Sequence, residues 1–432
     1  MTALLERIGA RGDISPQRAL TYGIIFLVVG LFIFLVFGLT AEPGQVSTFE
    51  LDVRGETLAL PVGNLNLPSR TVVNALAIIC AFVGGWQLAR GFRNANLALT
   101  GVAGAFVLAF LVWAARGDSL NLTSLLRSSL LRAVPIALAG LSGVLCERCA
   151  VINIGIEGMM LAGAFVAAMM ASVGANVLEW PFALSQILGL VSALAMGALL
   201  GLLLAVLAVR FKIDQIIAGT AINILATGLT SFLSARIMAE FSFLNNPGIL
   251  PPISIPLLAR IPILGPALFE QNLLVYLMFA LLFGSHVVLL YTVWGLRTRA
   301  VGEHPRAADT LGIDVFKNRY VNVTVGGMVG ALAGAFLILG SVGRFDELMT
   351  AGKGFIGLAA MIFGNWMPFG AFGAATIFGF ADALQTKLAI LQVPIPSQFL
   401  LMTPYLVTIV ALAGVVGEAV PPAADGEPYV KE

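Results

Sequence analysis

Residues 141–165, LSGVLCERCAVINIGIEGMMLAGAF, are long and apolar enough to lie in a membrane, yet they contain several charged or amide side chains. These side chains are Glu147, Arg148, Asn153 and Glu157. A charge at the bilayer centre costs about 2.5–3.5 kcal/mol on insertion scales, so each needs a partner, water or a place near the membrane surface. Gly155 and Gly158 would let other backbone approach closely, or let the helix break. The stretch therefore predicts a membrane helix that is interrupted at a polar site.

The polar residues of this stretch allow two interpretations. Asn153 and Glu157 are four residues apart and would share one face of a helix. Broken helices at membrane depth occur only where protein or a water-filled cavity surrounds them. In the first interpretation, Asn153, Gly155, Glu157 and Gly158 line or shape a translocation pathway. In the second, the polar pair caps a helix break and holds the scaffold, and the residues favour neither.

The whole chain has the composition of a membrane protein that crosses the bilayer many times. Of its 432 residues, 59% are hydrophobic and 11% are charged, whereas ordinary soluble domains carry about 25% charged residues. Several apolar segments contain Gly or Pro and could be half-helices or re-entrant. We expect an all-α bundle of about 10–12 spans. The segments lie at roughly 20–40, 71–89, 97–115, 127–147, 151–172, 184–208, 213–238, 271–295, 320–341, 355–366, 368–387 and 397–417.

The ends of the chain and its basic segments predict the orientation. Residues 1–19 are polar and carry three arginines, and the apolar run that follows is longer than a signal-peptide core. We therefore expect an uncleaved first span and a cytoplasmic N-terminus. Residues 297–319 hold five basic residues and fall on the same side. The C-terminal residues 418–432, with the sequence PPAADGEPYVKE at their end, read as a disordered tail.

One polar segment on the expected extracytoplasmic side predicts a small β-structure. Residues 48–62, TFELDVRGETLALPV, alternate apolar and polar side chains on each side of Arg-Gly-Glu. This alternation predicts a β-hairpin within an extracytoplasmic loop over 41–70.

A second polar cluster lies near the C-terminal end. Lys353 stands between Gly352 and Gly354 at the start of an apolar half-helix, which ends near Asn365 and Pro368. The dipole at a helix N-terminus favours anions and does not stabilise a cation. We expect Lys353 to lie at the surface and to pair with Asp346 or Glu347.

Several absences argue against catalysis and against other partners. The net charge of +1 gives no reason to expect nucleic acid, and no GxxxxGK[ST], HExxH or GxSxG motif occurs. Cys146 and Cys149 have CxxC spacing, but a zinc site needs two more ligands, so we interpret them as small semi-buried thiols. No metal or cofactor is expected. Gly326, Gly330 and Gly334 form one smooth helix face, which favours packing inside the bundle over a dimer seam.

Residues 297–319, RTRAVGEHPRAADTLGIDVFKNR, are polar although apolar segments flank them. Pro305 suits the first position of a helix, because its missing N–H costs nothing there, and Gly312 is a natural stop. The pattern predicts a helix over 303–312, and about two turns are too short to persist in water without packing on something. Docking to a soluble partner is one interpretation, and a lid on the bundle is the other.

Three ordered motifs resemble the permease subunits of ABC importers, most closely the nucleoside and simple-sugar branch of the branched-chain amino acid and simple-sugar permease superfamily. They are ERCAVINIGIEGMMLAGA (147–164), AVGEHPRAADTLGIDV (300–315) and GKGFIGLAAMIFGNWMPFGA (352–371). The resemblance covers roughly residues 120–415. It divides the chain into a permease core over 120–417 and additional N-terminal spans over 20–119.

The resemblance also implies partners. In this family the short cytoplasmic helix docks in a cleft of an ABC ATPase, a second homologous permease completes the pathway, and an extracytoplasmic binding protein delivers the substrate. We expect no enzymatic activity in this chain and a place in the bacterial plasma membrane. His304 stands where the family commonly has Asn. The implied docking residues are Gly302, Glu303, Pro305, Arg306, Ala307, Ala308 and Gly312.

The residues alone are compatible with three classes of function. The resemblance implies ATP-driven import of a nucleoside or related sugar-like solute, with a monosaccharide or a branched-chain amino acid as alternatives. An ion-coupled secondary transporter would need acidic residues placed for coupling, and Glu157 is one candidate. An intramembrane enzyme is disfavoured because no nucleophile–base pair or metal set is apparent.

Overall fold

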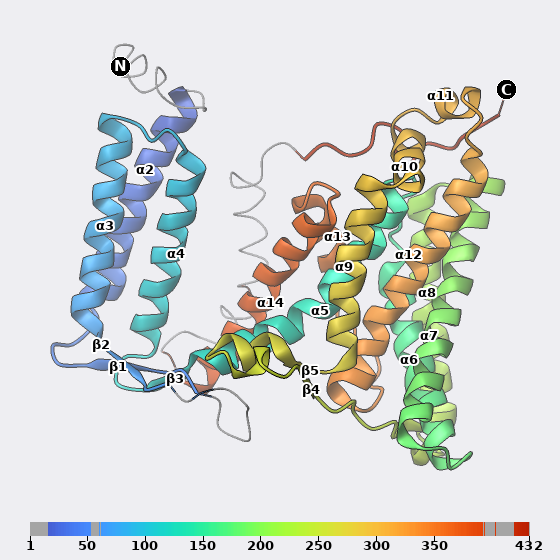
Figure 1. Ribbon diagram of the computed structural model, residues 1–432, viewed down its shortest axis with the longest axis horizontal. Helices are drawn as coiled ribbons and strands as arrows, with labels where there is room; N and C mark the ends of the chain where they lie inside the picture. The colour runs from blue at the N-terminus through green and yellow to red at the C-terminus, as the bar shows by residue number, and fades with distance from the viewer. Residues whose placement is uncertain are drawn as a thin grey trace. The chain divides into compact units, whose positions relative to one another are not determined.

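A computed structural model describes residues 16–52, 60, 62–391, 393, 402 and 419–431. The chain forms two compact units, and the main division between them falls at Ser124/Leu125. Unit 1 is built mainly from the residues before this division, and unit 2 mainly from the residues after it (Figure 1). The candidate sites all lie in unit 2.

Unit 1 is a bundle of three apolar helices with a small sheet. The helices are α2 (Pro16–Phe32), which continues into the π-helical turn η1 (Ile33–Gly38), α3 (Ser69–Ala89) and α4 (Ala95–Ala114). The strands are β1 (Val46–Glu50), β2 (Leu65–Pro68) and β3 (Ser119–Asn121), in the order β2-β1-β3.

The hairpin expected over 48–62 has different strands in the structure. β1 pairs antiparallel with β2, from Val46 opposite Pro68 to Phe49 opposite Leu65, and pairs parallel with β3. The register is fixed where α3 begins, because the Ser69 N–H donates to the Gln45 carbonyl oxygen over 3.0 Å. Residues 57–59 and 61, which make up most of the expected second strand, lie outside the described residues. The Arg-Gly-Glu turn lies outside the described residues.

The described residues of unit 2 include ten helices, three of them (α10, α11 and α13) too short to span a bilayer. They are α5 (Leu122–Glu147), α6 (Ile156–Asn176), α7 (Phe182–Ala205, continued by η2, Val206–Arg210), α8 (Gln215–Leu233, continued by η3, Ser234–Met238), α9 (Leu273–Tyr291), α10 (Val293–Glu303), α11 (Pro305–Thr310), α12 (Val315–Leu337, continued by η7, Ile338–Val342), α13 (Lys353–Phe363) and α14 (Pro368–Ile390). Short 3₁₀ and π turns and a two-stranded pairing of β4 (Ile253–Ser254) with β5 (Glu270–Gln271) connect α8 to α9.

The described residues include nine helices that are long and apolar enough to cross a membrane. The prediction of an all-α membrane bundle is confirmed. The expected half-helix is also present, since α13 has 11 residues and α14 begins at Pro368. The expected span over 271–295 ends earlier, at Tyr291, where Thr292 caps the separate helix α10. Most of the expected last span, 397–417, lies outside the described residues.

Helix α12 packs against α5, α6 and α7 through small residues. A Cβ atom at Gly334 would overlap the carbonyl oxygen of Met160 on α6, and one at Gly326 would overlap the sulfur of Cys146 on α5. At Gly330 it would lie 3.2 Å from the hydroxyl of Ser142. This confirms the prediction that the glycine face of α12 packs inside the bundle.

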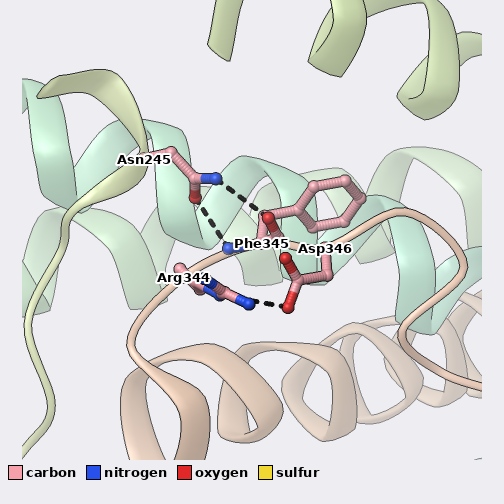
Figure 2. Close-up of polar contacts among 4 residues, drawn as sticks. All are labelled: Asn245, Arg344, Phe345 and Asp346. Atoms are coloured by element: carbon pink, nitrogen blue, oxygen red, sulfur yellow. Dashed lines mark hydrogen bonds and ion pairs between the residues drawn. The ribbon is translucent and has the colours of Figure 1, made fainter. Parts of the chain in front are cut away.

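The loop after α12 is anchored at the end of the core that is opposite to α11. Figure 2 shows the Asn245 amide bonded twice to the backbone of Phe345, with distances of 2.9 Å to its carbonyl and 2.7 Å from its N–H. The ring of Phe345 is buried and lies edge-on to Phe165 of α6, with centroids 5.3 Å apart. Asn245 therefore fixes the loop segment that packs the Phe345 ring against α6.

Candidate translocation and docking sites

Helices α5 and α6 are separated by a non-helical segment, residues 148–155. The chain turns out of α5 at Ala150, whose φ of +63° is uncommon for a residue with a side chain. Asn153 and Gly155 precede the first residue of α6, Ile156. The expected break is present, but Asn153 does not share a helix face with Glu157 as its spacing indicated. The reason is the non-helical backbone between 151 and 155, which separates Asn153 from the helix that carries Glu157.

Two side chains of α8 bind the backbone of the break. Asn223 donates from its amide nitrogen to the Ile154 carbonyl over 2.9 Å and accepts from the Gly158 N–H over 2.7 Å. Gln215 accepts from the Ile152 N–H over 2.6 Å. These bonds satisfy backbone groups that the interrupted helix leaves without partners, which is required away from water.

Glycines let α8 approach this closely. A Cβ atom at Gly219 would lie 2.8 Å from the Gly155 nitrogen, and one at Gly158 would lie 2.8 Å from the Asn223 Cα. Atoms at these distances would clash, so Gly219 and Gly158 have a steric role where α8 meets the break and α6, whereas a Cβ atom at Gly155 would approach no atom closer than 3.4 Å.

Glu157 caps a second broken helix. Its Oε1 accepts from the Gly352 N–H over 2.8 Å, and its Oε2 accepts from the Gly354 N–H over 2.6 Å. These donors lie at the start of α13, where the helix has no internal acceptors and where the dipole favours an anion. A Cβ atom at Gly354 would lie 2.7 Å from the Glu157 Cα, so only glycine fits against α6 there.

Arg148, at the other end of the break, binds the opposite end of α13. Its Nε donates to the Trp366 carbonyl over 2.8 Å, and its Nη2 donates to the Asn365 carbonyl over 3.2 Å. Burial lowers the pKa of Arg148 from its ordinary value, while the charge of Glu303 opposes this shift. An anion at the N-terminus and a cation at the C-terminus both match the α13 dipole. The α5–α6 segment thus holds α13 at both ends.

The predicted pairing of Lys353 is wrong. Asp346 pairs with Arg344, with 3.2 Å between Nε and Oδ2 (Figure 2), and the described residues contain no ion pair between Lys353 and either expected acid. The Lys353 side chain is half-buried. The anion that the start of α13 favours comes instead from Glu157, 195 residues earlier in the chain.

Asn153 points toward α5 and not toward α13. Its side chain is fully buried, and its amide nitrogen lies 3.5 Å from the Cys146 sulfur and 3.6 Å from the Met159 sulfur. Cys146 and Cys149 are free thiols, and both are fully buried, whereas the sequence predicted semi-buried thiols. Burial raises the pKa of Cys149 to about 12, so this thiol stays protonated and unreactive.

The helix expected over 303–312 is present as the shorter helix α11, Pro305–Thr310, and a separate helix, α10, precedes it. α10 ends at Glu303, and α11 begins at Pro305, which occupies its first turn. His304 makes no side-chain capping bond, as its replacement of the more usual Asn indicated. Gly312 has a φ of +81° and turns the chain toward α12.

The implied docking residues divide between a buried and an exposed set. Gly302 and Ala308 are buried inside the chain, and Pro305 is half-buried. Leu311, directly after α11, is 81% exposed. The exposed residues implied by the resemblance are Glu303, Arg306, Ala307 and Gly312.

Sequence reasoning missed Gln215, Asn223 and Leu311. A signal existed for Asn223, since an amide in an otherwise apolar spanning helix needs a partner. No local signal identified Leu311, because one leucine in a short amphipathic segment is as consistent with burial as with exposure.

The chain matches a known sequence family, described as "Branched-chain amino acid transport system / permease component", over residues 125–413. It is 41% identical over 316 residues to the guanosine ABC transporter permease protein NupQ of Bacillus subtilis, covering 72% of this chain and 97% of NupQ. It is 36% identical over 318 residues to the nucleoside ABC transporter permease protein NupC of Lactococcus lactis, covering 72% of this chain and 98% of NupC. A putative glucose ABC transporter permease, TsgC13 of Haloferax volcanii, is 35% identical over 263 residues, covering 61% of this chain and 77% of TsgC13.

Proposed function

Because the chain belongs to the family of permease components of branched-chain amino acid transport systems, we propose that it moves nucleosides inward as half of an ATP-driven importer. It is a multi-pass membrane transport subunit and not an enzyme. Two relatives with guanosine or nucleoside in their names align over nearly their whole length at 36–41% identity, and this observation carries the substrate class. A monosaccharide is the second candidate, supported by the glucose permease relative, which aligns over a smaller part of its length.

The energy for transport comes from a separate ATPase that docks on α11. The sequence has no phosphate-binding GxxxxGK[ST] motif, so ATP must bind to a partner. Leu311 is the apolar anchor of this interface, and Glu303, Arg306 and Ala307 surround it. Gly302 and Ala308 are buried and pack the helix against the rest of the chain. An ion-coupled mechanism would leave this exposed, well-formed element without a role.

The pathway is bordered by α6 and α13. Glu157 and Arg148 tie α13 to the α5–α6 break, so these broken helices move as one body beside the solute. Glu157 acts by holding this body together, which combines the two interpretations that the sequence left open. Breaks of this kind are tolerated at membrane depth because protein surrounds the interrupted backbone.

Two further protein partners complete the transporter. A second homologous permease faces this chain across the pathway, and an extracytoplasmic binding protein delivers nucleoside to the side opposite α11. The complex sits in a bacterial plasma membrane with α11 in the cytoplasm. Membrane lipid surrounds the apolar helices, and no cofactor or nucleic acid takes part.

The proposal is tested by uptake of labelled guanosine into vesicles that contain the permease pair, its ATPase and its binding protein. Unlabelled adenosine or cytidine in excess should suppress uptake, whereas glucose and leucine should not. Competition by glucose alone would move the substrate class to monosaccharides. Competition by leucine alone would move it to branched-chain amino acids.

A further inference from the structure

Residues 419–431, here called the C-terminal strap, fold back along the α11 end of unit 2 (Figure 1). Their polar composition predicted a disordered tail, and the structure corrects this expectation. Pro422, Ala424 and Tyr429 are buried, while Ala423 and Val430 are exposed. Three buried side chains in so short a non-helical segment indicate that it is docked on a surface.

The strap first binds the end of α10. The Ala424 N–H donates to the Gly302 carbonyl over 3.0 Å, and the Ala423 N–H donates to the Glu303 carboxylate over 3.1 Å. Gly302 has no room for a side chain, because a Cβ atom there would overlap the Arg148 carbonyl oxygen and lie 3.4 Å from Pro422. These contacts join the strap to the residues directly before α11.

The strap next binds α11 and the start of α12. Lys431 pairs with Asp309 of α11 over 3.3 Å. Arg319 of α12 donates to the Glu427 carbonyl over 3.0 Å, and the Tyr429 ring packs against Phe316 with centroids 5.4 Å apart. The docking helix is therefore flanked by strap contacts on both sides.

The strap also contacts the α5–α6 break and the residues directly after α13. The Val420 N–H donates to the Asn365 side chain over 3.1 Å, directly after α13. A Cβ atom at Gly426 would lie 2.8 Å from Ile152 in the α5–α6 break. The Asp425 carboxyl lies beside that of Glu147 at the end of α5. One short segment thus contacts the docking helix and both breaks.

We propose that the C-terminal strap is a positioning element that transmits movement of α11 to the α5–α6 break and α13. This inference rests on the proposed function, in which an ATPase moves α11. α11 has six residues and cannot persist alone in water, so it needs neighbours to act as a rigid lever. The strap supplies such neighbours, and it also connects the lever to the helices that border the pathway.

The inference predicts uncoupling without loss of assembly. A chain that stops after Glu418 and the variant Tyr429→Ala should keep ATPase binding and ATP hydrolysis, because Ala308 still holds α11 against Val301 and Val315 and the exposed side chains of α11 are unchanged. Nucleoside imported per ATP hydrolysed should fall by roughly fivefold or more, a typical size for coupling between sites. Tyr429→Phe keeps the ring on Phe316 and should restore coupling, and Val430→Ala is the matched control at an exposed neighbour.

The measurements are ATPase co-purification, ATP hydrolysis and uptake in the full reconstituted complex. Normal import per ATP in both the truncated chain and Tyr429→Ala would overturn the inference. Loss of ATPase binding in these variants would also overturn it, because the strap would then be part of the docking surface. Hydrogen exchange at the Ala424 amide reports strap docking without any substrate. Protection in the wild type that is lost in Tyr429→Ala supports the inference even if the substrate class is wrong.

Discussion

The carboxylate of Glu157 supplies two acceptors that the first turn of α13 cannot find within its own helix. Hydrogen bonds to charged groups contribute about 1.5–3 kcal/mol each. Both donors belong to glycines, and Gly354 is in contact with the backbone of Glu157 itself. Position 157 therefore needs both a negative charge and the length of Glu, since Asp would not reach the two N–H groups. Position 354 needs glycine, since a larger residue would not fit against Glu157.

Glu157→Leu should reduce nucleoside import about tenfold or more and lower the unfolding temperature, because two N–H groups at the α13 start lose their acceptors. Glu157→Gln keeps one acceptor and should lie between Leu and the wild type. Uptake and thermal unfolding of the purified complex measure both effects. Glu240→Leu, at an exposed carboxylate, is the control. Import at the wild-type rate by Glu157→Leu would exclude a role for this contact.

Asp425 should make strap docking sensitive to pH. Burial raises its pKa from the usual value near 3.8 to about 6 in the docked strap, although Arg319 and the hydrogen bond with Glu147 oppose the shift; Cys149 lies beside this cluster. The docked state binds the proton more tightly, so docking is favoured below pH 4 and this contribution is lost as pH rises through 6. Exchange at the Ala424 amide, corrected for intrinsic rates, should be slower at pH 5 than at pH 7.5. Asp425→Asn should remove the difference, and a difference that persists in this variant would assign it to another group.

At the scale of single elements, α11 has two faces with separate tasks. Ala308 is 2% exposed and packs in a cluster with Val301 and Val315, whereas Leu311 is 81% exposed. Substitutions at these positions should therefore fail in different ways. A large residue at 308 disturbs the chain's own packing, and a charge at 311 disturbs only the surface that the ATPase contacts.

Leu311→Glu should weaken ATPase binding by about 2 kcal/mol or more, the size typical of a hot-spot residue, with unfolding temperature unchanged. Ala308→Trp should lower the unfolding temperature as well. Leu257→Glu places the same charge at a leucine that is 76% exposed in the α8–α9 connection, and it should leave ATPase affinity intact. Titration of ATPase onto the detergent-purified permease gives the affinities. Equal affinities for Leu311→Glu and the wild type would place the ATPase elsewhere.

The glycine face of α12 gives a second prediction for an element. Gly334→Ala should destabilise unit 2 by about 1–3 kcal/mol, the usual cost of overpacking, because its Cβ would overlap backbone of α6. Gly284→Ala in α9 has open space around it and should be neutral or stabilising by up to about 1 kcal/mol, since alanine favours helices. Thermal or denaturant unfolding in detergent compares the two. Equal stability of the variants would show that α12 can shift away from α6 at no cost.

Residues that start or stop a helix in the local sequence were sufficient to predict the short helices α11 and α13. Pro305 and Gly312 marked α11, and Lys353 and Pro368 marked the ends of the half-helix. Contacts across long stretches of chain were not predictable in this way. Glu157 and Gly354 are 197 residues apart, and Asn223 and Ile154 are 69 apart. The strap was misjudged for the same reason, since composition describes its affinity for water and not the surface on which Tyr429 is buried.

For the whole molecule, sequence similarity and structure divide the chain at the same place. The family match begins at residue 125, and the division between the two units falls at Ser124/Leu125. The NupQ and NupC relatives are covered over 97% and 98% of their lengths by about 72% of this chain. The family match therefore excludes residues 1–124, which make up most of unit 1.

In the proposed mechanism, an ATPase moves α11 as it hydrolyses ATP. The strap transmits this movement to α6 and α13, and their movement allows nucleoside import. The most direct measurement is guanosine uptake into vesicles carrying the complete complex, with ATP, with a non-hydrolysable ATP analogue, or with imposed proton and sodium gradients alone. We predict uptake against a concentration gradient with ATP only. Uptake driven by an ion gradient in the absence of ATP would contradict the account and identify an ion-coupled transporter.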